Sequence, residues 1–359
     1  MGMAGPLDVP QSLTPASAQT IDGLLVSPNN EKTSTSPKNL SDMPVDVVGL
    51  IIERSDYKEQ LILRKTSKSL REIVEKQKPA LKRLRVSCRT DCIICEYNDH
   101  LIAYASPFCD FESVLSDVDE NHLDSLVLTT EYEQVAFDDL ASTLKNPKLQ
   151  LETFSFHSYC DDDCCKDEAN DTIYNKHGTM ERFLKSINHQ LSVNACNIAL
   201  LSFRGKMPIL SHLKPGQLET IVIDSSHSGD QWSNYSEEMD RIALLEQWKQ
   251  AKELEVHCFK EYDDFPAKHV THFKRFHFEQ EWLDPEYFVL IRNLISDHEN
   301  IEFCTIVIDE NSSWLLEEFN DMLGTLVSPN LYHYTIPDSE YYLELLFSDN
   351  RLTIEKKKK

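Results

Sequence analysis

The feature that most constrains the fold is a spacing of apolar residues that recurs from residue 80 onward. The frame is apolar-x-x-apolar-x-apolar, and its last two apolar positions alternate as one buried face of a short strand requires. The frames fall at Leu81/Leu84/Val86, Leu123/Leu126/Leu128, Leu151/Phe154/Phe156, Val193/Cys196/Ile198, Leu218/Ile221/Ile223, Ala251/Leu254/Val256, Phe273/Phe276/Phe278, Phe303/Ile306/Ile308 and Leu331/Tyr334/Ile336. Each frame predicts a strand.

Helical spacing occurs between the frames. The predicted helices carry Met180 to Leu191, Met239 to Trp248 after Ser236, Tyr287 to Leu294 after Asp284-Pro285, and Leu315 to Leu326 after Ser312 or Ser313. Strand and helix that alternate in this way predict a stack of units, each burying its apolar face against its neighbours. The expected fold class is therefore α/β, an irregular leucine-rich-repeat-like solenoid over residues 79–350. A doubly wound α/β domain is the alternative, but its buried strands favour longer continuous apolar runs.

Two shorter segments precede this array. Residues 1–38 are rich in Ser, Thr, Pro and Asn without a period, which predicts a disordered tail with three Ser/Thr-Pro pairs. Residues 39–78 predict a small domain of three short helices. Ser41 or Asp42 caps the first helix, with Pro44 in its first turn, and Asp56-Tyr57-Lys58-Glu59 is a capping-box pattern for the second. The third runs from Ser67 to Val74, and Leu70 lies on its apolar face.

The charge distribution limits the partners. The chain has 36 Lys and Arg against 60 Asp and Glu, a net charge of −24. Such an acidic chain disfavours nucleic acid and anionic membranes, since phosphate contacts need a basic surface. Residues 40–85 differ, because 11 basic and 7 acidic side chains give them +4, which suggests an acidic partner for this segment. With no apolar run of membrane-spanning length and no secretory pattern, we expect a cytoplasmic or nuclear protein with reduced thiols.

Cysteine clusters are the candidates for metal binding or catalysis. Cys88, Cys92 and Cys95 lie near His100 and Cys109, but a second closely spaced pair is missing, so buried thiols in a strand are the preferred interpretation. A second group, Cys160, Cys164 and Cys165, falls in an acidic loop predicted over 158–178. We therefore expect no metal, no cofactor and no catalytic residue, with an enzyme built on a spatially assembled Cys–His site as a remote alternative. Residues 351–359, which end in four lysines, predict a charged, solvated tail.

The helical segment and the array each resemble a known family. Leu40-x-x-Met43-Pro44-x-Asp46-Val47-Val48, with Ile51 and then Leu61-x-Leu63-Arg64-Lys65-x-Ser67-Lys68-x-Leu70-Arg71, resembles an F-box. Similarity to the FTH domain of the nematode-expanded F-box A family is carried by the stretches Phe183-Leu184-x-x-Ile187-Asn188-His189-Gln190-Leu191, Leu213-Lys214-Pro215-Gly216-x-Leu218-Glu219-x-Ile221, Glu246-Gln247-Trp248-Lys249-x-Ala251-Lys252-x-Leu254 and His272-Phe273-x-x-Phe276.

This resemblance implies the substrate receptor of an SCF-type cullin–RING ubiquitin ligase. Its F-box would dock on a Skp-family adaptor and, through it, a cullin, while the C-terminal domain would hold a protein target. By position, the docking residues are Met43, Pro44, Val47, Ile51, Leu61, Leu63, Lys68 and Leu70. The chain departs from the family pattern at Thr66 and Leu70. The alternative function is a solenoid protein–protein interaction module that recruits no ligase.

Overall fold

The computed structural model describes most of the chain after the N-terminal segment. It covers residue 40 and residues 43–89, 91–109, 123–158, 179–199, 208–224, 240–257, 267–280, 285–308, 319, 322–348 and 350–359. The predicted tail over 1–38 with its Ser/Thr-Pro pairs, the acidic loop after residue 158 and most of the helix predicted after Ser312 lie outside these residues. Residues Met43–Lys359 group into one compact unit.

Three helices open the described chain, as the sequence predicts: α1 (Val45–Arg54), α2 (Tyr57–Thr66) and α3 (Lys68–Lys76). Asp56 and Glu59 form the expected capping box, since each side chain accepts a hydrogen bond from the other's backbone N–H. Ser67 caps α3 by accepting from Leu70 N at 3.2 Å. The start of α1 differs from expectation, because Pro44 is itself the residue before the helix and its carbonyl accepts from Val47 and Val48.

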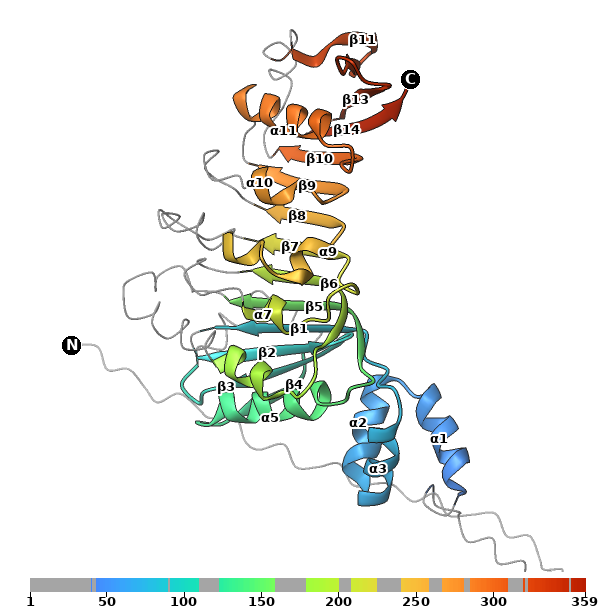
Figure 1. Ribbon diagram of the computed structural model, residues 1–359. Helices are drawn as coiled ribbons and strands as arrows, with labels where there is room; N and C mark the ends of the chain where they lie inside the picture. Colours follow the sequence, from blue (N-terminus) through green and yellow to red (C-terminus); the bar gives the residue numbers. More distant parts are fainter. Residues whose placement is uncertain are drawn as a thin grey trace, which may run out of the picture. The chain divides into compact units, whose positions relative to one another are not determined.

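In the described part of the chain, the strands that follow the helices form one sheet of 14 strands, which Figure 1 shows. Its strands are β1 (Arg83–Cys88), β2 (Cys92–Tyr97), β3 (His100–Ala105), β4 (Leu123–Leu128), β5 (Gln150–Ser158), β6 (Ser192–Ala199), β7 (Thr220–Asp224), β8 (Glu253–His257), β9 (Arg275–Gln280), β10 (Phe303–Ile308), β11 (Thr325–Ser328), β12 (Leu331–Thr335), β13 (Tyr341–Ser348) and β14 (Arg351–Lys358). The spatial order is β11-β12-β13-β14-β10-β9-β8-β7-β6-β5-β1-β2-β3-β4.

The centre of the sheet is parallel and follows the chain. Strands β5 to β10 lie side by side in sequence order, and β1 joins them next to β5, with every neighbouring pair parallel. At one end, β1, β2 and β3 are antiparallel neighbours, and β4 pairs parallel to β3. At the other end, β14, β13, β12 and β11 form an antiparallel ribbon.

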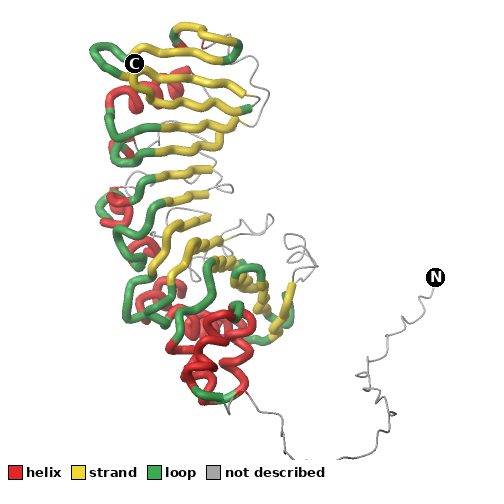
Figure 2. Tube along the Cα trace, turned by 90° about the vertical axis from the view of Figure 1, so that its right-hand side faces the viewer, coloured by secondary structure: helices red, strands yellow, loops and turns green. Residues whose placement is uncertain are grey.

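Helices cover one face of this sheet (Figure 2). They are α5 (Tyr132–Leu144), α7 (Pro208–Ser211), α9 (Glu246–Gln250), α10 (Ala267–Val270) and α11 (Pro285–Asp297), with a further helical stretch at residues 179–186. The helix predicted from Asp284-Pro285 is confirmed as α11. The continuous helix predicted from Met239 to Trp248 is wrong, because Leu245 takes an extended conformation (φ −71°, ψ 136°) and α9 begins only after it.

The recurring frame builds the core by strand register. Residues at its last two positions pair laterally in two apolar rows that run from β1 to β14. The rows are Leu84–Phe154–Cys196–Ile221–Leu254–Phe276–Cys304–Ile354 and Val86–Phe156–Ile198–Ile223–Val256–Phe278–Ile306–Leu352, all buried. The first position of the frame is also buried in most of these units, at Leu81, Leu151, Val193, Leu218, Ala251 and Phe273. One hydrophobic core therefore runs under the parallel strands.

Two frames were misplaced from the sequence. In β10 the residues aligned with the neighbouring frames are Ile301, Cys304 and Ile306, two positions before the predicted set. A shift of two keeps the same side chains on the core face, so alternation alone does not detect it. In β4, Leu126 and Leu128 are 39% and 56% exposed, because they lie on the face away from the main core, which Val127 contacts instead.

The C-terminal segment is the main correction to the predicted organisation. Residues 351–358 are not a solvated tail but strand β14, which pairs antiparallel with both β13 and β10. Leu352 and Ile354 are completely buried, while the lysines lie at the strand end and are tied to the sheet. Lys356 Nζ donates to His298 O at 2.9 Å, and Lys357 pairs with Glu344 at 2.6 Å. The chain is thus an N-terminal helical region followed by a large mixed sheet, and none of the helices described here has the length and apolarity to cross a bilayer.

Candidate functional site

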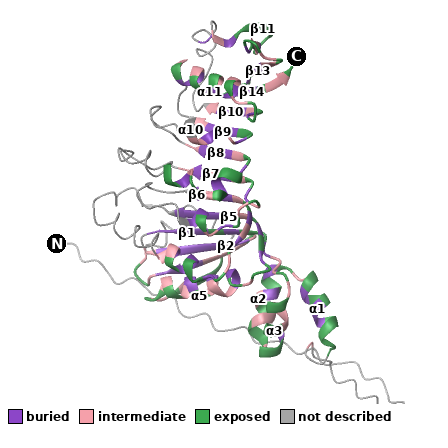
Figure 3. Ribbon diagram, viewed as in Figure 1, coloured by how far each residue is buried: buried purple, intermediate pink, exposed green. Residues whose placement is uncertain are grey.

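Helix α1 has one face in the core and one apolar face in solvent. Val48, Gly49 and Ile52 are buried. At Gly49 the backbone of α1 lies close to the Gln77 side chain, because a Cβ at this position would be 3.0 Å from Gln77 Nε2. Along α1, exposed residues alternate with these buried ones (Figure 3). An amphipathic helix usually turns charged residues outward, so an apolar outer face is unusual.

The exposed apolar residues of this region are concentrated within 20 positions. We call them the apolar helical surface, and they are Met43, Val45, Val47, Leu50, Ile51 and Ile62. Val47, Leu50 and Ile51 are neighbours on α1 at the spacings i, i+3 and i+4, and Leu50 is 58% exposed. Scattered exposed leucines are normal on proteins, whereas a group of exposed apolar residues on one helix face is typical of interaction sites.

The eight docking residues implied by the resemblance differ in their exposure to solvent. Met43, Pro44, Val47, Ile51 and Lys68 are exposed. Leu61 and Leu63 are intermediate, and Leu61 packs on the main core. Leu70 is only 4% exposed, so in this chain it holds the helices together.

Three exposed members of the apolar helical surface were missed from the sequence. Leu50 was detectable, because it lies three residues after Val47 on the same helical face. Val45 and Ile62 gave no comparable signal, since a β-branched residue in a short helix is equally suited to a core position.

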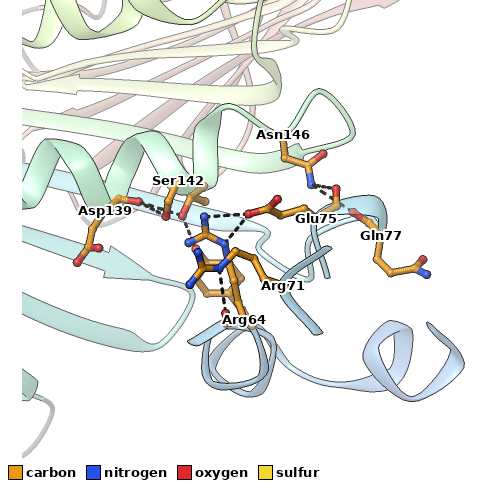
Figure 4. Close-up of polar contacts among 9 residues, drawn as sticks. Arg64, Arg71, Glu75, Gln77, Asp139, Ser142 and Asn146 are labelled. Atoms are coloured by element: carbon orange, nitrogen blue, oxygen red, sulfur yellow. Dashed lines mark hydrogen bonds and ion pairs between the residues drawn. The ribbon is translucent and has the colours of Figure 1, made fainter. Parts of the chain in front are cut away.

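Positive charge flanks the apolar helical surface, but part of it is engaged within the helices. Figure 4 shows the Arg64 guanidinium against Glu75, with hydrogen bonds of 3.1 and 3.2 Å, and Arg71 donating to the Arg64 carbonyl. Lys65 and Lys68 are exposed. These two lysines are therefore the better candidates for contact with an acidic partner.

Buried polar contacts attach the helices to the sheet region. The Tyr57 ring stacks on Tyr97 with centroids 5.6 Å apart, and its hydroxyl lies 2.6 Å from Thr143 Oγ1 on α5. Burial raises the pKa of Tyr57, so the hydroxyl stays protonated and can donate. The Gln60 amide donates to Ile52 O at 2.9 Å and accepts from Ala80 N at 3.0 Å.

A second group of hydrogen bonds between the helices and the sheet region lies just after the end of α5. The Asn146 amide donates to the carbonyls of Glu75 and Gln77 at 3.3 and 3.2 Å (Figure 4). These bonds satisfy carbonyls at the C-terminal end of α3, which have no partner within the helix. The apolar surface is thus carried by helices that are bonded to the rest of the chain.

The helix-free face of the parallel sheet carries a polar cluster at the carboxyl ends of its strands. His257 on β8 contacts Glu255 Oε1 through Nε2 at 2.8 Å and Glu279 on β9 through Nδ1. The hydrogen bonds to Glu255 and Glu279 raise the pKa of His257 to about 9, against the opposing effect of burial. His277 lies beside this pair, with a ring centroid 6.1 Å from that of His257, and burial lowers its pKa.

The same face continues onto β5 and β6. Burial lowers the pKa of His157 to about 4, so its imidazole is neutral at physiological pH. In the next row of the sheet, Ser155 pairs with Asn197, whose Oδ1 is buried without a hydrogen-bond partner among the described residues. Glu255 belongs to this face as well, through its contact with His257. Just before the strands, Glu219 forms an ion pair with Lys252, and Lys274 forms one with Glu302.

The described cysteines do not provide an activated nucleophile. Cys88, Cys95, Cys196 and Cys304 are completely buried, and burial raises the pKa of Cys196 to about 12 and that of Cys95 and Cys304 further. A reactive thiol needs a lowered pKa and access to solvent. Cys160, Cys164 and Cys165 lie outside the described residues.

Comparisons with known proteins match both regions. Residues 40–82 match the F-box domain and residues 175–323 match the FTH domain. The chain is 24% identical over 310 residues to F-box A protein 224 of Caenorhabditis elegans, a match that covers 85% of this chain and 76% of that protein. The F-box match contains α1, α2 and α3, and the FTH match contains strands β6 to β10.

Proposed function

Because the chain is an F-box protein with a C-terminal FTH domain, we propose that it is the substrate receptor of an SCF-type cullin–RING ubiquitin ligase. The helices would bind a Skp-family adaptor and, through it, a cullin. The sheet region would hold a protein target. The mechanism is proximity, since a target and a ligase bound to one chain meet at a raised effective concentration. No catalytic group of this chain takes part.

The observation that carries the proposal is the apolar helical surface within the F-box match. Burying an exposed leucine such as Leu50 contributes about 1.5–3 kcal/mol before the costs of association. Several such residues on one helix face give enough apolar area for a specific contact. The exposed Lys65 and Lys68 beside it suit an acidic adaptor, and they favour encounter more than final affinity.

We place the target on the helix-free face of the parallel strands. Support comes from the strand order, because β5 to β10 succeed each other in space as in sequence and helical segments return on the other face. That arrangement favours an irregular leucine-rich-repeat-like solenoid, whose strand face is a common binding surface. The polar cluster around His257 lies on this face, and so does Asn197 Oδ1, which has no hydrogen-bond partner within the described part of the chain. A cytoplasmic or nuclear site of action would follow from the ligase assignment.

The test is co-purification of the full chain with a Skp-family adaptor. We expect wild type to co-elute and Leu50→Asp to bind at least about tenfold more weakly, because a carboxylate would be buried in the contact. Leu244→Asp is the matched control, since Leu244 is 72% exposed but lies outside the F-box match.

One outcome would refute the ligase assignment, and a second would refute the docking surface alone. Wild type that forms no complex at micromolar concentration, with adaptor that binds a control F-box, would leave an interaction module without ligase recruitment. Equal binding by wild type and Leu50→Asp would show that the apolar helical surface is not the docking site.

A further inference from the structure

The cysteines of β2 lie on opposite faces of the sheet. Cys92 and Cys95 are three residues apart, and side chains at an odd spacing in a strand point to opposite sides. Cys95 belongs to the main core beneath the helices, together with Cys88. Cys92 belongs to a small separate cluster on the other face, with Ala103 and Ala105. The Cys-x-x-Cys pair therefore cannot bind one metal ion.

A backbone turn after β3 gives Cys92 a different neighbour. Cys92 pairs in register with Ala105, the last residue of β3. Ser106 N then donates to Asp91 O at 3.0 Å, and Cys109 N donates to Ser106 O at 3.0 Å. The turn brings Cys109 back over the start of β2. One carboxylate oxygen of Asp91 and the two Sγ atoms of Cys92 and Cys109 consequently lie within 4.8 Å of one another.

The three side chains already interact through protons. Cys109 is hydrogen-bonded to the carboxylate of Asp91 and to the sulfur of Cys92. A bound zinc ion would take the place of the thiol protons.

We propose that Asp91, Cys92 and Cys109 form a binding site for a zinc ion. Tetrahedral zinc has Zn–S bonds of about 2.3 Å and Zn–O bonds of about 2.0–2.2 Å, which set the sulfur atoms about 3.8 Å apart. The ligand atoms need only a small closure to reach that spacing. Two thiolates and one carboxylate favour zinc over magnesium or calcium, which prefer oxygen ligands alone. Cys109 is partly exposed, so solvent can supply the fourth ligand.

The ion would link two segments at this end of the sheet. It would join the first residues of β2 to the turn that follows β3, next to the edge strand β4. Phe108 in the same turn is 89% exposed and contributes no core packing. A metal bond would therefore order a turn that has little apolar burial.

The test measures zinc on the full chain and three variants. Cys109→Ala removes a ligand and Asp91→Asn removes its charge, while Phe108→Ala is the matched control in the same turn. We expect gel-filtered wild type to retain about one zinc ion per chain. Cys109→Ala should bind at least about tenfold more weakly in competition with a chromogenic chelator, and Phe108→Ala should equal wild type. Cobalt(II) should give a thiolate charge-transfer band that Cys109→Ala diminishes.

The outcomes are decisive and independent of adaptor binding. Zinc that raises the melting temperature of wild type and Phe108→Ala, but not of Cys109→Ala, would support the site. Wild type that binds zinc only at millimolar concentration would overturn it. Equal zinc retention by Cys109→Ala would also overturn it, since the ion would then be held by other residues.

Discussion

Removing the buried hydrogen bond between Tyr57 and Thr143 tests whether the F-box is packed on the sheet region. The two hydroxyl oxygens are 2.6 Å apart and both residues are buried. They are 86 positions apart in the sequence, one on α2 and one on α5. The bond therefore exists only if the F-box helices and the sheet region are folded against each other.

The expected loss in the free energy of unfolding depends on whether each substitution leaves a buried hydroxyl without a hydrogen-bond partner. Tyr57→Phe leaves Thr143 Oγ1 bonded to Asp139 O at 3.4 Å, so the loss should be about 1 kcal/mol. Thr143→Val leaves the Tyr57 hydroxyl buried without this partner, which costs about 1–3 kcal/mol. The double variant should lose less than the sum, with a coupling energy of about 1 kcal/mol.

The assay is urea unfolding at pH 7, followed by far-ultraviolet circular dichroism for wild type, both single variants and the double variant. Tyr342→Phe on β13 is the control, since this partly exposed tyrosine should change the free energy of unfolding by less than about 0.5 kcal/mol. A coupling energy of zero within about 0.3 kcal/mol would refute the packing of α2 on α5.

Three further predictions concern stability. Ile52→Ala should cost about 2–5 kcal/mol in urea unfolding and Leu50→Ala less than about 0.5 kcal/mol, because Ile52 is fully buried and Leu50 is 58% exposed; equal losses would contradict the two-faced α1. Gly324→Ala should lower the melting temperature sharply, because φ is +94° and a Cβ would lie 2.4 Å from His333 O; an unchanged melting temperature would contradict this turn. The pKa of His257 is raised from 6.5 to about 9, so this residue contributes stability that is complete below pH 6.5 and is lost as the pH rises through 9. His257→Gln should therefore flatten the decline in unfolding free energy between pH 6.5 and 9. A decline parallel to that of wild type would count against the ion pairs.

The strands of the parallel region were predictable because register and periodicity agree. A residue such as Leu254 is buried by alternation on its own strand, and the same alternation aligns it with Ile221 and Phe276 on the neighbours. The capping box at Asp56 was predictable for a similar reason, since both partners lie within one turn. Local patterns identified these elements because the interactions that form them are either local or recur at the same position of each neighbouring strand.

The elements that the sequence did not predict depend on contacts between residues that are distant in the chain. Leu352 and Ile354 alternate like a strand, but only pairing with β10 and β13 distinguishes β14 from a lysine-rich tail. The approach of Cys109 to Cys92 likewise depends on the turn after β3, whereas sequence spacing favoured Cys95 as the neighbour.

Docking residues could be predicted only as a set, because burial decides their roles. Leu70 and Leu50 are both leucines at helical positions of the F-box. One is 4% exposed and the other 58% exposed, and this difference arises from how α1, α2 and α3 pack together. A motif aligned by position therefore mixes residues that stabilise the helices with residues available to a partner.

The two proposed binding surfaces differ in chemistry, and this difference has a consequence for the complex. The apolar helical surface offers Val47, Leu50 and Ile51, so adaptor binding should gain most of its free energy from buried apolar area and change little with salt. The helix-free sheet face offers Glu255 and His257, whose contacts with a target would be polar and partly screened at high ionic strength. Raising the salt concentration should therefore release a target while the adaptor stays bound. A receptor built in this way would exchange targets without leaving the ligase.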